Sequence, residues 1–508
     1  MQVYILFLDG KKLKSRILIH LKLYQLNNLI DISENISVPR ILIGLWQIAD
    51  MEKHGNTLDS NSISKFMKIY ADNGFTSFDM ADHYGSSEII SGVFKNNYKD
   101  PGKINLFTKW VPKPGKISKE STREAVNNAL KRMNQSQIDL MQFHAWQYQD
   151  PSWLDALYYL KELKVEGKIK DIGVTNFDTI HLRIALASEI PIVSNQICYS
   201  LLDRRASLDM SELCKEFNVK LLAFGTLAGG FLSNRWLGKS EPKIDSKLNW
   251  SQMKYKRFID VTGGWALFQK LLIQLDLIAN QNNTSIANIA SRYILEDSNV
   301  ASVIIGARLG ENNYIEEHKK ILNIKLSKSD KELIAKSLNL FNKVPGDCGD
   351  EYRKPPFLTA SGDLSHHLDS MPNIFKVKKI NYMRENISSN TSWEKMASYS
   401  RAVKHGNRII VSGTTATHED KVIGKEDPIA QTDFIIDKIE ASISSLGGKL
   451  SDVVKTRVFV KNIEDWKKIA ETHGKRFKGI NPANTLVQAK LVGEEYLVEI
   501  EAEAIIKD

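Results

Sequence analysis

Four side chains in the first third of the chain can together donate a proton: Asp79, Tyr84, Lys109 and His144. A phenol with a pKa of ~10 is a weak acid at neutral pH, but a neighbouring ammonium group lowers that pKa. A carboxylate keeps the ammonium group charged and in place, and an imidazole can orient a carbonyl oxygen or relay its proton. The four residue types therefore predict general-acid chemistry, provided that the fold brings them together.

Short apolar runs predict the strands that position these residues. Asp79, Lys109 and His144 each stand at the end of such a run, and Tyr84 lies in the turn after the first of the three. Eight runs between residues 40 and 324 are typical of strands buried on both faces. They are Ile41–Trp46, Phe75–Asp79, Ile104–Lys109, Ile138–His144, Ile169–Val174, Ile192–Ile197, Lys220–Phe224 and Ala301–Gly306. Helical patterns separate them, so the sequence predicts an α/β fold, a (β/α)8 TIM barrel.

Chemistry in such a barrel lies at the carboxyl ends of the strands, where three of the four residues are expected. A simpler interpretation is that Asp79 and Lys109 form a buried ion pair that only closes the barrel. The loop from Gly225 to Gly264, after the seventh strand, is unusually long. It is a candidate lid over a substrate or cofactor, or else a surface excursion held by packing.

Composition limits the classes of function. The chain has 508 residues, which predicts two or three domains. Its net charge of +9 comes from lysines interleaved with acidic residues, which argues against a nucleic-acid partner. No apolar stretch reaches about 18 residues, so no membrane span is expected. Three widely spaced cysteines without a CxxC pair favour a reducing, cytoplasmic location and no metal site; Cys348, His366 and His367 match no metal-binding spacing.

A second domain follows the barrel. We assign residues 1–36 to an N-terminal extension of unknown role, 37–325 to the barrel, 326–378 to a turn-rich linker lying on it, and 379–508 to a small α+β domain. In the last domain we expect strands at Ile409–Gly413, Val453–Val460, Thr485–Val492 and Tyr496–Ile506, and helices at Pro428–Leu446 and Asp465–Phe477.

The barrel sequence resembles the aldo/keto reductase family between about residues 40 and 326. The resemblance rests on segments such as Phe78-Asp-Met-Ala-Asp-His-Tyr-Gly85, Phe107-Thr-Lys109, Asp139-Leu-Met-Gln-Phe-His144 and Gly167-Lys-Ile-Lys-Asp-Ile-Gly-Val-Thr-Asn-Phe177. It implies that Tyr84 is the general acid, that Lys109, paired with Asp79, lowers the pKa of that tyrosine, and that His144 orients the substrate.

The same resemblance implies a nicotinamide cofactor, NADP(H), in an extended pose. Asn176 and Gln196 match the family's ligands for the carboxamide group, and Phe224 matches the ring that contacts the nicotinamide. Arg308 would bind the adenosine 2′-phosphate, for which a guanidinium group is well suited, and Glu317 falls in the adenine region, where His318 replaces the family's asparagine. The remaining positions expected at the cofactor are Gly44, Trp46, Gly225, Leu227, Gly229 and Gly306.

The C-terminal domain resembles the Rid (YjgF-like) family of reactive-intermediate deaminases, through segments such as Asp452-Val-Val-Lys-Thr-Arg-Val-Phe-Val460 and Pro482-Ala483. The resemblance implies a chorismate-mutase-like fold, a homotrimer, and a cleft that includes Tyr399, Ser412, Asn484 and Glu499. Deaminating members of the family carry an arginine at the position of Asn484. Because an amide lacks the guanidinium charge and fork, imine hydrolysis is not expected here.

Three functions follow from these observations. The first is an NADPH-dependent oxidoreductase that interconverts an aldehyde or ketone and an alcohol, with a small-molecule carbonyl substrate and a C-terminal domain that trimerises or binds a ligand. The second is a bifunctional reductase and imine or enamine deaminase. The third is an NADP(H)-sensing binding protein with slow turnover; the complete set of four residues argues against a loss of chemistry but not against slow chemistry.

Overall fold

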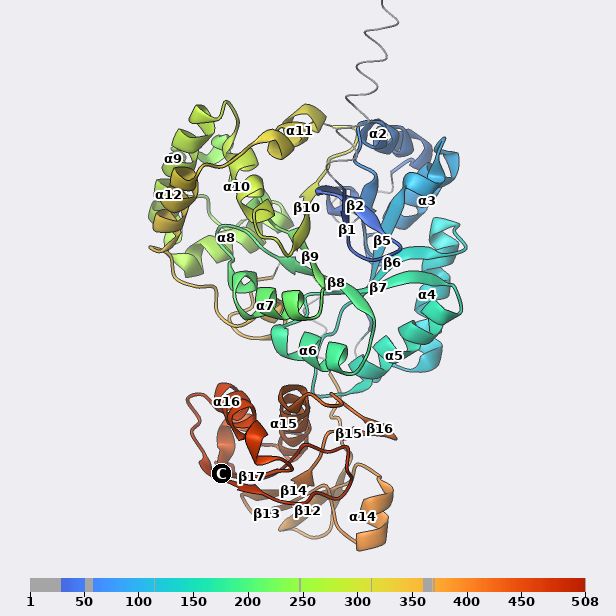
Figure 1. Ribbon diagram of the computed structural model, residues 1–508, viewed down its shortest axis with the longest axis vertical. Coiled ribbons are helices and arrows are strands. Elements are labelled where there is room, and N and C mark those ends of the chain that lie inside the picture. The colour runs from blue at the N-terminus through green and yellow to red at the C-terminus, as the bar shows by residue number, and fades with distance from the viewer. Residues whose placement is uncertain are drawn as a thin grey trace, which may run out of the picture.

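The computed structural model describes residues 29–50, 58–113, 115–245, 248–311, 313–359, 368 and 371–507. Most of the N-terminal extension, and the pair His366-His367, lie outside the described residues. The chain folds into a large α/β body and a smaller C-terminal body beside it (Figure 1). None of the described helices is both long enough and apolar enough to cross a membrane.

Eight parallel strands form a closed barrel in the order β10-β3-β4-β5-β6-β7-β8-β9, which confirms the predicted fold. The strands are β3 (Ile41–Gly44), β4 (Ser77–Asp79), β5 (Asn105–Trp110), β6 (Ile138–Phe143), β7 (Ile169–Thr175), β8 (Ile192–Cys198), β9 (Lys220–Phe224) and β10 (Val300–Gly306). The ends of each strand lie within two residues of the ends of one predicted run. The runs could be recognised because a strand that is buried on both faces requires a continuous apolar sequence.

Helices surround the barrel (Figure 1). They are α2 (Ser60–Asp72), α3 (Ser87–Asn97), α4 (Lys119–Met133), α5 (Ser152–Val165), α6 (Thr179–Ala187), α7 (Asp209–Glu216), α8 (Trp250–Thr262), α9 (Gly264–Gln281), α10 (Ile286–Leu295), α11 (Ile315–Asn323) and α12 (Lys328–Leu338). Ser118 caps helix α4, since its Oγ accepts from the Ser121 amide while Ser121 Oγ accepts from the Ser118 amide.

A hairpin closes the amino-terminal end of the barrel. Strands β1 (Leu29–Asp31) and β2 (Ser37–Pro39) pair in antiparallel fashion. Their apolar side chains belong to one buried cluster with residues of the barrel strands: Ile32, Ile36, Val38, Leu42, Phe107, Leu140 and Leu222. The sequence boundary placed after residue 36 therefore falls between the two strands of this hairpin.

The segment after α12 runs along the open, carboxyl-terminal end of the barrel. It includes the short helix α13 (Asp350–Arg353), whose Glu351 accepts a charged hydrogen bond from Arg205 at 2.7 Å. The buried Cys348 belongs to the barrel's hydrophobic core cluster. The structure therefore places this part of the predicted linker on the barrel.

The C-terminal body is built on a seven-stranded sheet in the order β11-β12-β13-β14-β19-β17-β18. The strands are β11 (Val377–Lys379), β12 (Arg384–Ile387), β13 (Ala402–His405), β14 (Arg408–Thr414), β17 (Val453–Val460), β18 (Ala483–Gln488) and β19 (Val498–Ile505). Helices α15 (Pro428–Ser445) and α16 (Trp466–Arg476) lie on one face, and α14 (Ser392–Ala397) and the β15–β16 pair (Thr417–His418 and Lys421–Val422) complete the body. All four predicted strands and both predicted helices are present, but β11, β12 and β13 were not expected.

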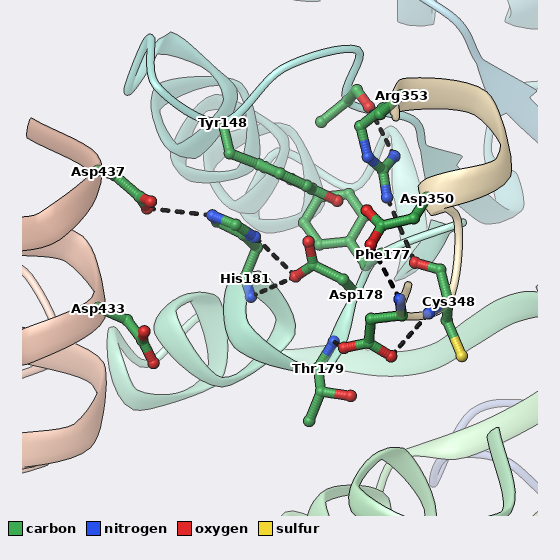
Figure 2. Close-up of polar contacts among 12 residues, drawn as sticks. Tyr148, Phe177, Asp178, Thr179, His181, Cys348, Asp350, Arg353, Asp433 and Asp437 are labelled. Atoms are coloured by element: carbon green, nitrogen blue, oxygen red, sulfur yellow. Dashed lines mark hydrogen bonds and ion pairs between the residues drawn. The ribbon is translucent and has the colours of Figure 1, made fainter. Parts of the chain in front are cut away.

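Charged side chains join the two bodies, with α15 against α6. Figure 2 shows His181 of α6 between Asp178 at 2.6 Å and Asp437 of α15 at 3.0 Å, with its ring stacked on Tyr148. Burial disfavours the imidazolium, but the two carboxylates outweigh it and raise the pKa of His181 to about 9. Arg183 likewise pairs with Asp427 at 2.6 Å. Along α6 the contact is therefore charge-complementary, with cations on the barrel helix and carboxylates on the C-terminal body, whereas the pairs Asp155–His418 and Glu189–Lys425 have the opposite polarity.

Candidate active site

A cavity of about 580 Å³ opens at the carboxyl ends of the barrel strands, a size typical of small-molecule sites. Asp79, Tyr84, Lys109 and His144 all line it, so the fold brings the four predicted residues to one site. The long segment after β9 also contributes to the wall, with Asn249, Ser251, Gln252, Lys254 and Tyr255 at or near the start of α8. The segment therefore lies at the cavity, as expected of a loop that covers a substrate or cofactor.

Asp79 and Lys109 form a buried pair on neighbouring strands. Lys109 Nζ lies 2.6 Å from Asp79 Oδ2 and also donates to the Met80 carbonyl at 2.8 Å. Burial lowers the pKa of Lys109, while the adjacent carboxylate opposes that shift and favours the charged amine. The second oxygen of Asp79 accepts from Gln142 at 3.0 Å and Gln196 at 2.7 Å. These bonds hold the carboxylate, and through it the ammonium group, in one place.

A tight turn positions Tyr84 beside this pair. Gly85 has φ +65°, and a Cβ there would collide with the Asp50 carboxylate. That carboxylate accepts from the amide and the hydroxyl of Ser86, at 3.0 and 2.6 Å, which fixes the turn. The Tyr84 ring packs edge-on against Trp46 at 5.0 Å between centroids, and its centroid lies 5.3 Å from Lys109 Nζ. The phenol is therefore held within the field of the ammonium group.

His144 follows β6 directly and continues the sheet, with its amide donating to the Trp110 carbonyl at 3.0 Å. Its ring lies 4.5 Å from that of Trp146 in an edge-on arrangement, and its Nδ1 lies 3.4 Å from the Thr175 carbonyl. These contacts fix the plane of an imidazole that is 3% exposed and lines the same cavity as Tyr84.

Ten of the eleven residues predicted at the cofactor line the cavity: Gly44, Trp46, Asn176, Gln196, Phe224, Gly225, Leu227, Gly229, Gly306 and Arg308. A nicotinamide carboxamide would find a complementary group there. Within the described part of the chain, Asn176 Oδ1 is buried and has no hydrogen-bond partner. It can accept from the carboxamide NH2, whereas the Gln196 NH2 is already used by Asp79 and Gln142, which leaves Gln196 only its oxygen.

The loop after β9 suits a phosphate group. Gly225 and Gly229 have φ of +72° and +64°, and a Cβ on Gly225 would collide with Tyr255 Oη. The absence of side chains at both positions lets a ligand approach the backbone amides closely. The residues present therefore fit a nicotinamide dinucleotide at its carboxamide and at its phosphates.

Glu317 is the one residue of the predicted cofactor set that does not line the cavity. It lies on α11, and its carboxylate accepts from Lys320 at 2.6 Å and from Asn288 at 3.2 Å. The neighbouring His318 is buried against Tyr70 and Phe75, and burial lowers its pKa to about 4. Tyr314, directly before α11, lines the cavity. The place of Glu317 in the adenine region stays a prediction.

Other cavity residues were not found from the sequence, among them His83, Trp146, Arg235, Trp236, Lys254, Tyr255, Tyr314 and Tyr352. Arg353 stands just behind the wall and holds two site loops. Its guanidinium donates to the Asn176 carbonyl at 2.5 Å and to the Ala145 carbonyl at 3.1 Å, and it lies 4.7 Å from the Tyr148 ring that stacks on His181 (Figure 2). The Tyr148 ring therefore lies between His181, which contacts the C-terminal body, and Arg353, which binds the loops that carry Asn176 and His144.

The residues of the predicted C-terminal cleft are not all together within one chain. Tyr399, Ser412 and Glu499 lie around the buried Arg401, whose guanidinium donates to the Ser412 and Gly413 carbonyls. Burial raises the pKa of Glu499, and Arg401 opposes the shift. Asn484 is on β18, where its amide donates to Thr456 Oγ1 of β17 at 2.9 Å. Glu499 pairs with Phe459, three residues further along β17, so Asn484 and Glu499 lie apart along the sheet.

Comparisons with known proteins agree with both resemblances. Residues 40–339 match the model of the aldo/keto reductase family, and residues 390–506 match the model described as Endoribonuclease L-PSP. A RutC family protein of Pyrococcus abyssi (strain GE5 / Orsay) is 35% identical over 105 residues, which is 20% of this chain and 83% of that protein. The C-terminal domain is therefore a Rid (YjgF-like) domain.

Several relatives match the barrel, and two of them show the extent of the overlap. Aldo-keto reductase YhdN of Bacillus subtilis (strain 168) is 26% identical over 343 residues, or 63% of this chain and 96% of that protein. NADH-specific methylglyoxal reductase of Escherichia coli (strain K12) is 29% identical over 224 residues, or 43% of this chain and 64% of that protein. The family model covers more than half of the chain and includes Asp79, Tyr84, Lys109 and His144. The chain belongs to the aldo/keto reductase family, and it carries a Rid domain at its C-terminus.

Proposed function

We propose that this chain reduces a small aldehyde or ketone to an alcohol with NADPH as the hydride donor. The family is one of oxidoreductases that use nicotinamide cofactors on carbonyl compounds. The observation that carries the proposal is the convergence of Asp79, Tyr84, Lys109 and His144 on one cavity whose wall also holds the unpartnered Asn176 Oδ1. A protein that only binds the nucleotide, without catalysing a reaction, would not need this set of four proton-donating and proton-orienting side chains.

A bound nicotinamide supplies a hydride to the carbonyl carbon. The chain's own contribution is the proton, which Tyr84 Oη gives to the carbonyl oxygen as that oxygen becomes negative. Lys109 stabilises the resulting phenolate, and Asp79 keeps the lysine charged and fixed at 2.6 Å. His144 orients the carbonyl oxygen toward the phenol. Because the Asp79 and Lys109 side chains are buried, and aromatic side chains such as Trp46 and Phe224 line the cavity, these charges act in a medium of lower dielectric constant than water.

Arg308 supports NADPH over NADH as the donor. One relative is named NADH-specific, so membership of the family does not decide between the two nucleotides. Arg308 stands at the cavity with its side chain 46% exposed, and its polar contacts with described residues, Gln47 at 3.4 Å and Glu311 at 3.9 Å, are both long. A guanidinium group in this situation can take a phosphate oxygen pair without first breaking a strong ion pair.

We expect Arg308→Leu to raise the Kd of NADPH by about 10- to 100-fold and that of NADH by less than about 3-fold, since only NADPH has a 2′-phosphate for the charge-assisted bonds. Quenching of protein fluorescence measures both affinities. Arg292→Leu is the matched control, because Arg292 pairs with Glu296 outside the cavity. Equal affinity of the wild-type chain for the two nucleotides would contradict the assignment of NADPH.

The Rid domain, we propose, assembles the chain rather than hydrolysing imines. Asn484 has no charge with which to bind a carboxylate, and it lies apart from Glu499 along the sheet. Helices α15 and α16 cover one face of the sheet, while the other presents partly exposed side chains such as Ile410 and Phe459. The Rid resemblance implies that three such faces meet in a trimer.

Mass photometry of the full chain tests this assembly. We expect a species of three times 57.6 kDa at nanomolar to micromolar concentration. Ile410→Lys, which puts a charge on the uncovered sheet face, is expected to shift the distribution to the monomer. Lys378→Ile, on the short strand β11, is the control for a change of one charge on the same sheet. A wild-type chain that stays monomeric at all these concentrations would contradict the proposal.

A further inference from the structure

The backbone of Asn176 has a conformation that neighbouring contacts must hold. Asn176 is the residue expected to bind the nicotinamide carboxamide, and it follows strand β7 directly, with φ +57°. This left-handed conformation is uncommon for residues other than glycine, and it persists where the surrounding structure fixes it. The barrel supplies one contact, since the Asn176 amide donates to the Gln196 carbonyl at 2.8 Å. Two further supports come from the chain beyond the barrel.

The segment after the barrel supplies one of them. Arg353 of α13 donates to the Asn176 carbonyl at 2.5 Å. Gly349, with φ +78°, lies so close that a Cβ there would collide with the same carbonyl. Asp347 accepts from the Thr179 amide at 2.8 Å. These contacts fix the loop at its first residue, Asn176, and at the start of α6.

The Rid domain supplies the other support, through His181 of α6. Asp178, two residues after Asn176, accepts from the His181 amide at 2.8 Å and lies 2.6 Å from its ring Nδ1. Nε2 of the same ring lies 3.0 Å from Asp437 of α15 (Figure 2). All three side chains are buried, so water has little access to replace the Asp437 carboxylate. The imidazole thus links Asp437 to the loop that begins at Asn176.

The two supports meet at one aromatic ring. Burial opposes the charge of His181, but the carboxylates on either side keep the ring an imidazolium, which donates from both nitrogens. This ring stacks on Tyr148, with centroids 3.5 Å apart, and the guanidinium carbon of Arg353 lies 4.7 Å from the centre of the Tyr148 ring. Cations that contact the same aromatic ring are held by it. The contact with the Rid domain and the contact with the Asn176 carbonyl are therefore parts of one buried network.

Asp437 also has a partner inside the Rid domain. Arg476 of α16 donates to Asp437 Oδ1 at 2.7 Å, whereas His181 contacts Oδ2. Arg476 contacts Asp433 and Glu440 as well, at 3.4 and 3.5 Å. A carboxylate that served only to pair with Arg476 would affect the stability of the Rid domain, but it would not affect a ligand in the barrel. The two roles therefore differ in a measurable quantity.

We propose that Asp437 of the Rid domain is a positioning residue for the reductase site, and that it holds the Asn176 loop in the conformation that binds the nicotinamide carboxamide. This inference rests on the proposed reductase function and extends it: docking of the Rid domain sets the affinity of the barrel for the nicotinamide end of the cofactor. Arg308 follows β10, and its contacts with described residues, Gln47 and Glu311, lie outside this network. The adenine end should therefore bind independently of Asp437.

Two ligands that share the adenine end test this role in the full chain. We would measure by calorimetry the Kd of NADPH and that of 2′,5′-ADP, which lacks the nicotinamide. Asp437→Leu is expected to weaken NADPH by about 5- to 20-fold and 2′,5′-ADP by less than about 2-fold, since only NADPH carries the carboxamide. Asp437→Asn keeps an acceptor for His181, so its effect on NADPH should be smaller; it carries the test if Asp437→Leu does not fold.

Two control variants separate this role from a general change at the contact. Glu440→Gln removes a carboxylate that lies one turn after Asp437 on α15 and contacts Arg476. His418→Gln removes a different pair between the two bodies, in which His418 lies 2.9 Å from Asp155. Both variants should keep the wild-type affinities for NADPH and for 2′,5′-ADP.

Hydrogen–deuterium exchange of the same full-length variants needs no ligand and is measured in every case. Peptides over residues 175–182 should exchange about 3-fold faster or more in Asp437→Asn than in the wild type, and at the wild-type rate in Glu440→Gln. Unchanged exchange, or equal weakening of both ligands in a folded Asp437 variant, would overturn the inference. If the wild type binds neither ligand, the reductase proposal fails by itself, and the exchange rates alone then decide whether Asp437 fixes the loop.

Discussion

Tyr84→Phe should lower kcat for carbonyl reduction by about 10³- to 10⁴-fold, because it removes the proton donor and leaves the ring in place. The ring packs on Trp46 and lies over Lys109, and neither contact needs the hydroxyl group. The affinity for NADPH should therefore change by less than about 2-fold. Single-turnover oxidation of NADPH, followed by fluorescence, separates the chemical step from binding.

The control for this variant is Tyr98→Phe, which removes a phenol that donates to Asp72 at 3.0 Å on the outside of the barrel. It should reduce carbonyl compounds at the wild-type rate. A Tyr84→Phe chain that kept more than about one tenth of the wild-type rate would mean that another group supplies the proton. His144 would then be the next candidate, since it lines the same cavity.

Lys109→Met should be much less active and also less stable. It removes the ammonium group beside Tyr84 and leaves the buried Asp79 carboxylate with the Gln142 and Gln196 amides as its remaining side-chain donors among the described residues. Breaking a buried pair in this way typically costs about 3 to 5 kcal/mol. We expect kcat to fall by about 10²-fold or more and the urea midpoint of the barrel to fall with it.

A double variant separates the two effects. Lys109→Met with Asp79→Asn removes both charges, so most of the stability should return while kcat stays low. The rate and the urea midpoint would be measured on the same preparations. Recovery of both in the double variant would show that the pair only closes the barrel, which is the simpler interpretation of its sequence.

The barrel and its four central residues were predictable for a physical reason. A parallel strand buried on both faces must be apolar throughout, so its run is visible in the sequence, and residues at its carboxyl end face the site. The strands of the C-terminal domain were harder to recognise. Strand β12, with the sequence Arg-Glu-Asn-Ile, and β11, with Val-Lys-Lys, have mostly exposed or half-buried side chains and therefore carry no apolar pattern.

Residues brought to the site by loops could not be predicted. Lys254 and Tyr352 meet because α8 and α13 both pack on the open end of the barrel, and no spacing in the sequence relates them. Arg353 joins Asn176 and Ala145 for the same reason. Glu317 lies outside the cavity lining, and its place in the adenine region, which the resemblance alone implies, stays a prediction.

The central claim is that the cavity binds NADPH and delivers its hydride to a carbonyl compound. Fluorescence titration of the full chain with NADPH and with NADH, followed in the same cuvette by a panel of aldehydes, tests it most directly. We predict micromolar or tighter binding of NADPH, weaker binding of NADH, and oxidation of NADPH that depends on the aldehyde. Binding of neither nucleotide would contradict the account, and the roles proposed for Asn176, Arg308 and Tyr84 would fail together.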